Sequence, residues 1–215
     1  MDSRSSDLAA GPAREDALPA SAATAVKIVV VGGFGVGKTT MVGSVSEIRP
    51  LTTEETMTEV SVGVDDVRGV EQKSATTVAM DFGRISINDE LVLYLFGTPG
   101  QQRFWFLWTG LFEGALGAVV LVDTRRLEAS FDVIGRLEDG GVPFIVAVNV
   151  FPDAPTHPLD EVRAALDLPA AVPIVDCDAR SRASSRDTLL ALMSYLYSLS
   201  TQTAAAPVAA SASTE

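Results

Sequence analysis

Nearly continuous apolar runs recur through the middle of the chain and are separated by polar stretches with turn residues at their borders. Strands that are buried on both faces of a parallel sheet have this pattern, because neither face meets water. The runs lie at 25–32, 91–97, 117–123, 143–149 and 173–178. Residues 76–87 alternate more, which predicts an edge strand that pairs antiparallel with 91–97 through the turn 88–90.

Helices are expected between these strands, at 38–48, 103–115, 127–139, 158–167 and 185–200. Strands that alternate with helices imply right-handed crossovers and a doubly wound sheet. We therefore predict an α/β fold in which helices flank a mostly parallel sheet of six strands. Ligands of such folds bind beyond the carboxyl ends of the strands. Residues 49–75 fit least well, and they predict either a long loop or a short extra strand.

The chain has 215 residues, of which 47% are hydrophobic, and this is enough for one domain with its own core. Both ends are rich in Ala and Ser and have few large apolar side chains, so they cannot offset the entropy of ordering. We predict a disordered tail at 1–24, a folded domain at 25–201 and a second disordered tail at 202–215.

The balance of charge narrows the classes of partner. A net charge of −12 and a pI of about 4.5 argue against nucleic acid and against a polybasic membrane anchor. The single cysteine, Cys177, excludes an internal disulfide and fits a reducing cytoplasm. The single histidine, His157, leaves no multi-histidine metal site. No signal peptide and no membrane-spanning run are visible, so we expect membrane recruitment only through a partner.

The stretch "GGFGVGKT" between the first strand and the first helix matches the Walker A pattern. Its glycines let backbone amides wrap around phosphate oxygens, and the helix N-terminus adds positive potential. Lys38 would reach the β- and γ-phosphates, and the Thr39 hydroxyl would bind Mg²⁺. The candidate phosphate-binding residues are Gly32, Gly33, Phe34, Gly35, Val36, Gly37, Lys38, Thr39 and Thr40.

Residues 25–200 resemble Ras-like small GTPases, which are P-loop NTPases. The elements "TTVAMDFG" and "FGTPGQ" are similar to those of the actinobacterial conservon-type ATP/GTP-binding proteins and, more distantly, of the gliding-motility (Mgl-type) GTPases. The resemblance implies a cytoplasmic switch that binds GTP or GDP with Mg²⁺. It also implies a roadblock/LC7-type partner and a complex with a sensor-kinase-like protein.

The resemblance assigns roles to residues that follow the phosphate-binding loop. Thr77 resembles the switch I threonine that senses the γ-phosphate through Mg²⁺, with Thr76 as the alternative, and both would otherwise be ordinary strand residues. Gly100 resembles the switch II glycine whose amide meets the γ-phosphate. Gln101 resembles the glutamine that orients the attacking water, so Gln101 and Lys38 are the candidate catalytic residues.

One element departs from the family pattern, because Gly97 stands where a metal-ordering aspartate is expected. Glycine cannot hold a metal-bound water, so another carboxylate would have to replace it. Asp81 is our candidate metal residue beside Thr39 and Thr77, since strand alternation places it on the same face as Thr77. Asp123 is the rival, although in this fold that position usually caps the following turn.

The guanine-recognition element is also altered, to "NVFPDA". Asn149 is kept, Val150 replaces a lysine, and the acid appears one place late as Asp153. The later element "CDARS" resembles the loop whose alanine amide meets the guanine oxygen, which assigns Ala179 and Arg180 to the base. The resemblance favours GTP over ATP.

The stretch after Gln101 is unusually apolar. Trp105, Trp108 and Phe112 have helical spacing, which predicts core packing or a partner surface beside switch II. Arg103 is expected to be solvated, with a catalytic role as the alternative.

We therefore expect a GTPase switch with weak intrinsic hydrolysis that a partner accelerates. The alternative is a scaffold that binds GTP or ATP without useful hydrolysis, which Gly97 and Val150 favour and Gln101 disfavours.

Overall fold

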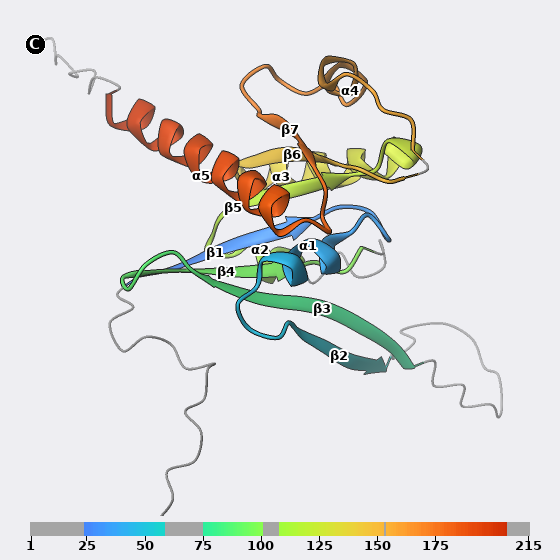
Figure 1. The fold of residues 1–215 in the computed structure, drawn as a ribbon, viewed down its shortest axis with the longest axis vertical. Coiled ribbons are helices and arrows are strands. Elements are labelled where there is room, and N and C mark those ends of the chain that lie inside the picture. The colour runs from blue at the N-terminus through green and yellow to red at the C-terminus, as the bar shows by residue number, and fades with distance from the viewer. Residues whose placement is uncertain (1–23, 59–74, 101–107, 153, 206–215) are drawn as a thin grey trace, which may run out of the picture.

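The computed structural model of the protein describes residues 24–58, 75–100, 108–152 and 154–205. Within these ranges the strands form one sheet in the order β2-β3-β4-β1-β5-β6-β7 (Figure 1). Strands β1 and β4 to β7 run parallel, whereas β3 pairs antiparallel with both β2 and β4. The strands are β1 (Thr24–Val31), β2 (Leu51–Thr58), β3 (Ala75–Ser86), β4 (Leu91–Gly97), β5 (Ala115–Val122), β6 (Phe144–Asn149) and β7 (Ile174–Cys177).

The predicted α/β fold with a doubly wound sheet is confirmed, and each of the six predicted strands is present. The strand count needs a correction, because the described residues contain a seventh strand, β2, in the segment left open at 49–75. β2 is the edge, so β3 lies one place inside it. The sequence of β2, LTTEETMT, is mostly polar and therefore lacks the apolar run that signals a buried strand.

The helices differ from the prediction mainly at their borders. The predicted helix 127–139 is two elements, because the 3₁₀ segment η2 ends at Ser130 and α3 begins at Phe131; η2 itself has non-helical angles at Arg126 (φ −145°, ψ 55°). The predicted helix 103–115 is described only at its end, since residues 101–107 lie outside the described ranges. The helices are α1 (Lys38–Val45), α2 (Trp108–Phe112), η2 (Thr124–Ser130), α3 (Phe131–Asp139), α4 (Leu159–Ala165) and α5 (Arg182–Ala205).

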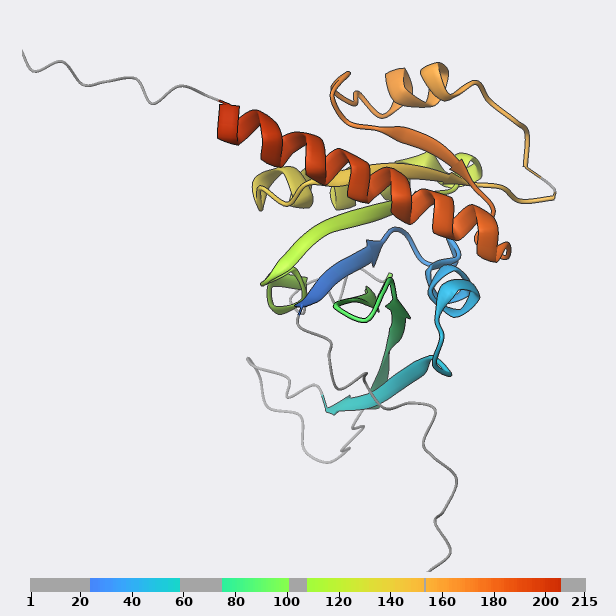
Figure 2. The same ribbon diagram turned by 60° about the vertical axis from the view of Figure 1, so that its left-hand side comes forward.

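Two buried layers cover the two faces of the sheet. Ile28 and Val30 of β1 pack with α1 and α5, and the neighbouring Val29 and Val31 pack with α2, α3 and α4. Figure 2 shows α5 lying across the part of the sheet that β5, β6 and β7 form. Because both faces are covered, the alternate side chains of β1 are all fully buried from Ile28 to Val31.

Most residues of the two predicted tails lie outside the described ranges. β1 begins at Thr24 and α5 extends to Ala205. None of the described helices combines the length and the apolar character needed to cross a membrane.

Candidate functional site

The loop between β1 and α1 has a backbone that only glycine adopts easily. Gly32, Gly35 and Gly37 have φ of 142°, 75° and 106°. A Cβ on Gly37 would lie 2.7 Å from Asn149 Nδ2, and one on Gly32 would lie 2.4 Å from the Leu121 carbonyl oxygen. The loop can therefore wrap closely only with glycine at these positions, which supports its interpretation as a phosphate-binding loop.

Lys38 begins α1 and is folded back over the same loop. Its Nζ donates to the carbonyl oxygens of Gly32 at 2.9 Å and Gly33 at 2.8 Å. Burial lowers the pKa of Lys38 to about 8, and the nearby negative charge of Asp81 opposes this shift only in part. Because the charge of Asp81 compensates this buried ammonium only in part, the ammonium is well placed to bind a phosphate group.

The second residue of α1, Thr39, is joined to β3. Its Oγ1 donates a 2.6 Å hydrogen bond to Oδ2 of Asp81, a carboxylate that is only 6% exposed. Asp81 pairs with Gly97 across the β3–β4 ladder, and a Cβ on Gly97 would lie 2.9 Å from Asp81 Oδ2. The Asp81 carboxylate thus fills the space beside Gly97 and reaches Thr39 from the neighbouring strand.

These residues surround a pocket of about 290 Å³ at the carboxyl ends of β1 and β4. Gly100 closes one side, because a Cβ there would lie 2.7 Å from Lys38 Nζ and 2.8 Å from the Cα of Phe34. The pocket therefore brings together the predicted phosphate-binding loop, the predicted metal residues Thr39 and Asp81, and the predicted switch II glycine. Its lining is Phe34, Gly35, Gly37, Lys38, Thr39, Thr40, Asp81, Thr98, Pro99 and Gly100.

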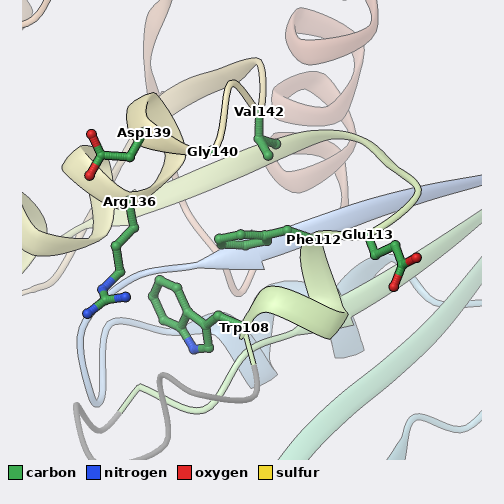
Figure 3. Close-up of a pocket in the computed structure, with 7 residues that line it drawn as sticks. All are labelled: Trp108, Phe112, Glu113, Arg136, Asp139, Gly140 and Val142. Carbon is green, nitrogen blue, oxygen red and sulfur yellow. The ribbon is translucent and has the colours of Figure 1, made fainter.

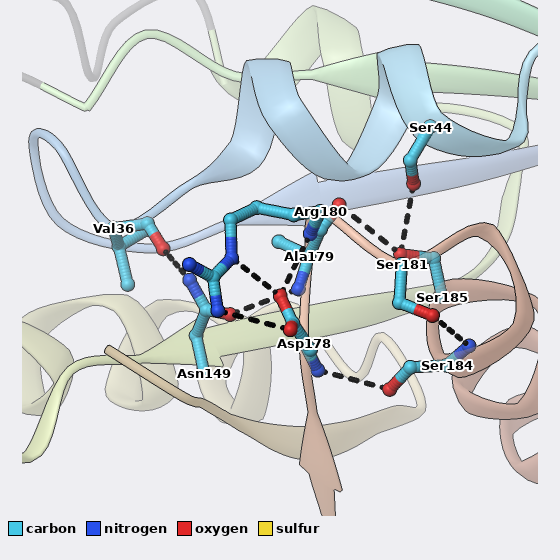
Figure 4. A network of polar contacts seen from close by, with 9 residues as sticks. All are labelled: Val36, Ser44, Asn149, Asp178, Ala179, Arg180, Ser181, Ser184 and Ser185. Carbon is cyan, nitrogen blue, oxygen red and sulfur yellow. Dashed lines mark hydrogen bonds and ion pairs between the residues drawn. The ribbon is translucent and has the colours of Figure 1, made fainter. Parts of the chain in front are cut away.

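Asn149, at the end of β6, links this loop to the loop after β7. Figure 4 shows its amide between Val36 and Ala179. Nδ2 donates to the Val36 carbonyl oxygen at 2.8 Å, and Oδ1 accepts from the Ala179 amide at 3.0 Å. The Ala179 amide, predicted to meet a base, is thus held by Asn149. Arg180 pairs through Nε with Asp178 at 2.9 Å and is exposed.

Six residues that the sequence analysis singled out cannot be placed by their side chains. Gln101 and Asp153 lie outside the described residues, as do Arg103 and Trp105. Thr77 lies in β3 opposite Thr56, but only its backbone is described, and the same holds for Thr76. Their roles stay predictions.

Asp123, the rival metal candidate, is not among the residues that line this pocket. Its carboxylate caps η2 and accepts from Arg125 Nε at 2.9 Å and from an Arg126 guanidinium nitrogen at 3.3 Å. These hydrogen bonds, chiefly from Arg125, hold the pKa of Asp123 below its usual value. The arrangement supports Asp81 over Asp123 as the carboxylate beside Thr39.

Residue-by-residue reasoning missed Arg125 and Arg126. Arg126 donates to the Phe34 carbonyl oxygen at 3.1 Å, and the Arg125 guanidinium lies 3.9 Å from the Phe151 ring centroid. The available signal was the sequence Asp-Thr-Arg-Arg directly after a buried strand, at the edge where ligands of this fold bind.

A second pocket, of about 400 Å³, lies between α2 and α3 (Figure 3). Trp108 and Phe112 line it from α2, with ring centroids 5.5 Å apart, and Arg136 and Asp139 line it from α3. Trp108 is 2% exposed and its indole N–H lies 3.4 Å from the Pro99 carbonyl oxygen. Trp108 is therefore a core residue, which confirms for this side chain the prediction of core packing.

Comparisons with known proteins show the family to which the chain belongs. Residues 30–199 match a family described as "conserved hypothetical ATP binding protein". The "uncharacterized protein MJ1339" of Methanocaldococcus jannaschii is 31% identical over 126 residues, which cover 58% of this chain and 69% of that protein.

Two solved structures share the fold. The FeoB G-domain from Methanococcus jannaschii has a TM-score of 0.54 and 16% identity, with 80% of this chain and 98% of that one covered. The G domain of the T. maritima FeoB iron transporter has a TM-score of 0.53 and 16% identity, with 82% and 99% covered. At this identity the likeness shows the fold alone, which is that of a P-loop G domain. The chain belongs to the family of conserved hypothetical ATP-binding proteins and is a nucleotide-binding P-loop protein.

Proposed function

We propose that the protein is a Mg²⁺-dependent GTP-binding switch that hydrolyses GTP slowly. The observation that carries the proposal is the 2.6 Å hydrogen bond from Thr39 to Asp81, beside Gly97. A carboxylate is thereby supplied from β3 at the place where the family pattern has lost one on β4. Burying a carboxylate costs free energy unless it is paired, so the almost complete burial of Asp81 at the phosphate-binding loop supports a role for its charge there.

The phosphates of the nucleotide would lie in the pocket over α1. The Lys38 ammonium and the amides of the glycine-rich loop are the charges and donors that stabilise them, and the N-terminus of α1 adds its dipole. Gly100 would bring a backbone amide close to the terminal phosphate, because it already lies against Lys38 and Phe34. The presence of the γ-phosphate could thus be sensed by the segment that begins at Gly100.

The residues present fit a magnesium ion. Mg²⁺ prefers oxygen ligands, few of them from the protein, together with phosphate oxygens. The Thr39 hydroxyl and the Asp81 carboxylate both offer oxygen atoms as metal ligands, and Thr39 Oγ1 lies 2.6 Å from Asp81 Oδ2. When bound, the ion would supply neutralising charge to the β- and γ-phosphates. We assign it to Thr39 and Asp81, with Thr77 as the residue that the resemblance adds.

Hydrolysis would proceed by in-line attack of water on the γ-phosphate. Gln101 is assigned to orient that water and Lys38 to stabilise the charge that develops. Weak intrinsic turnover and acceleration by a partner follow from the resemblance, as do a cytoplasmic location, a role in bacterial signalling and a roadblock/LC7-type partner with a sensor-kinase-like complex. The resemblance is to conservon-type and Mgl-type proteins.

A scaffold that binds GTP or ATP without useful hydrolysis is the second candidate. The exposed Val150 favours it, because a lysine is expected there in a guanine-specific loop. The description of the matching family also names ATP.

The deciding experiment measures the affinity of the full chain for fluorescent GTP, GDP and ATP, with and without Mg²⁺. Lys38→Ala is the control that should abolish binding, since it removes the only described ammonium in the pocket. We expect guanine-selective binding that Mg²⁺ strengthens, followed by slow single-turnover hydrolysis. Equal affinity for ATP and GTP with no hydrolysis would favour the scaffold. A nucleotide affinity that is the same with and without Mg²⁺ would contradict the Mg²⁺-dependent switch.

A further inference from the structure

One buried carboxylate holds two arginines that point at two different loops of the site. Asp123 is 3% exposed and accepts from the backbone amide and the guanidinium of Arg125 and from the guanidinium of Arg126. The two arginines are sequence neighbours, yet they diverge because the backbone of η2 is kinked at Arg126. We call Asp123, Arg125 and Arg126 the arginine fork.

The first arm of the fork touches the phosphate-binding loop. The Arg126 nitrogen that binds Asp123 also donates to the Phe34 carbonyl oxygen at 3.1 Å. In a trans peptide the carbonyl and the following N–H point in opposite directions. Holding the Phe34 carbonyl toward Arg126 therefore turns the Gly35 N–H the other way. Asn149 holds the Val36 carbonyl and fixes the Gly37 N–H by the same principle.

The second arm touches the loop after β6. The Arg125 guanidinium lies 3.9 Å from the Phe151 ring centroid, which is the distance of a cation–π stack. Phe151 follows Asn149 and Val150 in the altered "NVFPDA" element. Arg125 is therefore in contact with the segment that, by the resemblance, would lie beside the nucleotide base.

We propose that the fork is a positioning device for nucleotide binding, in which Arg126 orients the phosphate-binding amides and Arg125 sets the base-binding loop. The inference rests on the proposed function only for the base selectivity, because the phosphate arm applies to any nucleotide. The Asp123 carboxylate is charged at neutral pH, and its hydrogen bonds, chiefly from Arg125, hold its pKa below the usual value, so both arms keep a charged partner. Neither arginine needs to touch the nucleotide for this role.

The test uses three variants of the full chain, Arg126→Met, Arg126→Lys and Arg125→Met, and two measurements on each. The first measurement is the affinity for inorganic tripolyphosphate, which has no base. The second is the ratio of the affinities for GTP and ATP. Arg186→Met is the matched control, since Arg186 lies on α5 and pairs there with Asp187. Thermal unfolding of each variant separates loss of fold from loss of binding.

We expect Arg126→Met to weaken tripolyphosphate, GTP and ATP about equally, by roughly tenfold, which is the effect of one lost charge-assisted hydrogen bond. Arg126→Lys should recover part of that loss, because its ammonium can still donate to the Phe34 carbonyl. We expect Arg125→Met to leave tripolyphosphate affinity unchanged and to shift the GTP to ATP ratio by about threefold or more.

Different outcomes would contradict the two arms of the inference and the proposed function, so the three can be judged separately. Unchanged tripolyphosphate affinity in Arg126→Met contradicts the phosphate arm, even if the wild type is a GTP switch. An Arg125→Met variant that loses all three ligands equally, or none, contradicts the base arm. A wild type without guanine preference contradicts the proposed function while the tripolyphosphate measurement still decides the role of Arg126.

Discussion

Asp81 and Gly97 face each other across the β3–β4 ladder, and the Asp81 carboxylate occupies the space that a side chain at position 97 would need. The carboxylate meets the Thr39 hydroxyl at 2.6 Å. The two positions are therefore coupled, because only one of them can carry an acidic side chain without a collision. This coupling can be measured at both residues.

Asp81→Asn should weaken the dependence of nucleotide affinity on Mg²⁺. The change keeps the shape of the side chain and removes its charge, so the Mg²⁺ concentration needed for half-maximal binding should rise by about 10- to 100-fold. A magnesium titration with fluorescent GTP measures this. Asp89→Asn, in the exposed turn after β3, is the control that should leave the titration unchanged.

Gly97→Asp should destabilise the chain and should be rescued by Asp81→Gly. The single variant places two carboxylates together and puts its Cβ 2.9 Å from Asp81 Oδ2. The double variant returns one carboxylate to the site, from the other strand. In a double-mutant cycle of unfolding free energies the coupling should be about 1–3 kcal/mol. Strictly additive effects would show that the two positions are independent.

Nucleotide affinity should fall as the pH rises through 8, because the unliganded Lys38 has a pKa of about 8. Phosphates stabilise the charged ammonium, so binding above this pH must first protonate Lys38. We expect constant affinity at lower pH and a dissociation constant that rises toward about tenfold per pH unit above it. Calorimetry in buffers of different ionisation enthalpy should detect the uptake of a proton. In Lys38→Arg the guanidinium stays charged, so the slope should disappear whatever the absolute affinity.

Asn149→Ala should lower both stability and nucleotide affinity. The change removes the amide that donates to the Val36 carbonyl oxygen and the oxygen that accepts from the Ala179 N–H. Both backbone groups are then left buried without the Asn149 side chain as partner. We expect a loss of about 2–4 kcal/mol in urea unfolding. Asn88→Ala, which removes the exposed turn contacts to Glu90 and Leu91, should cost about 1 kcal/mol or less. Equal losses would show that Asn149 has no special role.

Gly37→Ala should impair nucleotide binding, whereas Gly135→Ala should increase the stability of the chain. Gly37 has φ of 106°, and a Cβ there meets Asn149 Nδ2 at 2.7 Å, so alanine should abolish tight nucleotide binding. Gly135 lies within α3 with no atom within 4 Å of an added Cβ, so alanine should stabilise the chain by about 0.5–1 kcal/mol. Binding assays and urea unfolding of the two variants separate the backbone requirement from a general effect of alanine.

Local pattern was enough for most of the fold. Strands β1, β5 and β6 were visible in the sequence as apolar runs, because both of their faces pack under helices. β2 gave no such signal, since its residues are mostly polar and it pairs at the edge. The kink at Arg126 was equally invisible, because its neighbours have ordinary helix-forming side chains.

The sequence by itself determined where the glycine-rich loop lies and singled out Asp81 as the candidate carboxylate. The loop is a contiguous motif, and the pairing of β3 with β4 follows from a short turn, so strand alternation could place Asp81. Only the tertiary structure decided that Asp81 reaches Thr39, that Asn149 holds both Val36 and Ala179, and that Asp123 directs its arginines to two loops. The physical reason is distance along the chain. These contacts join residues brought together by the order of the strands, and no local pattern records which side chains meet across a sheet.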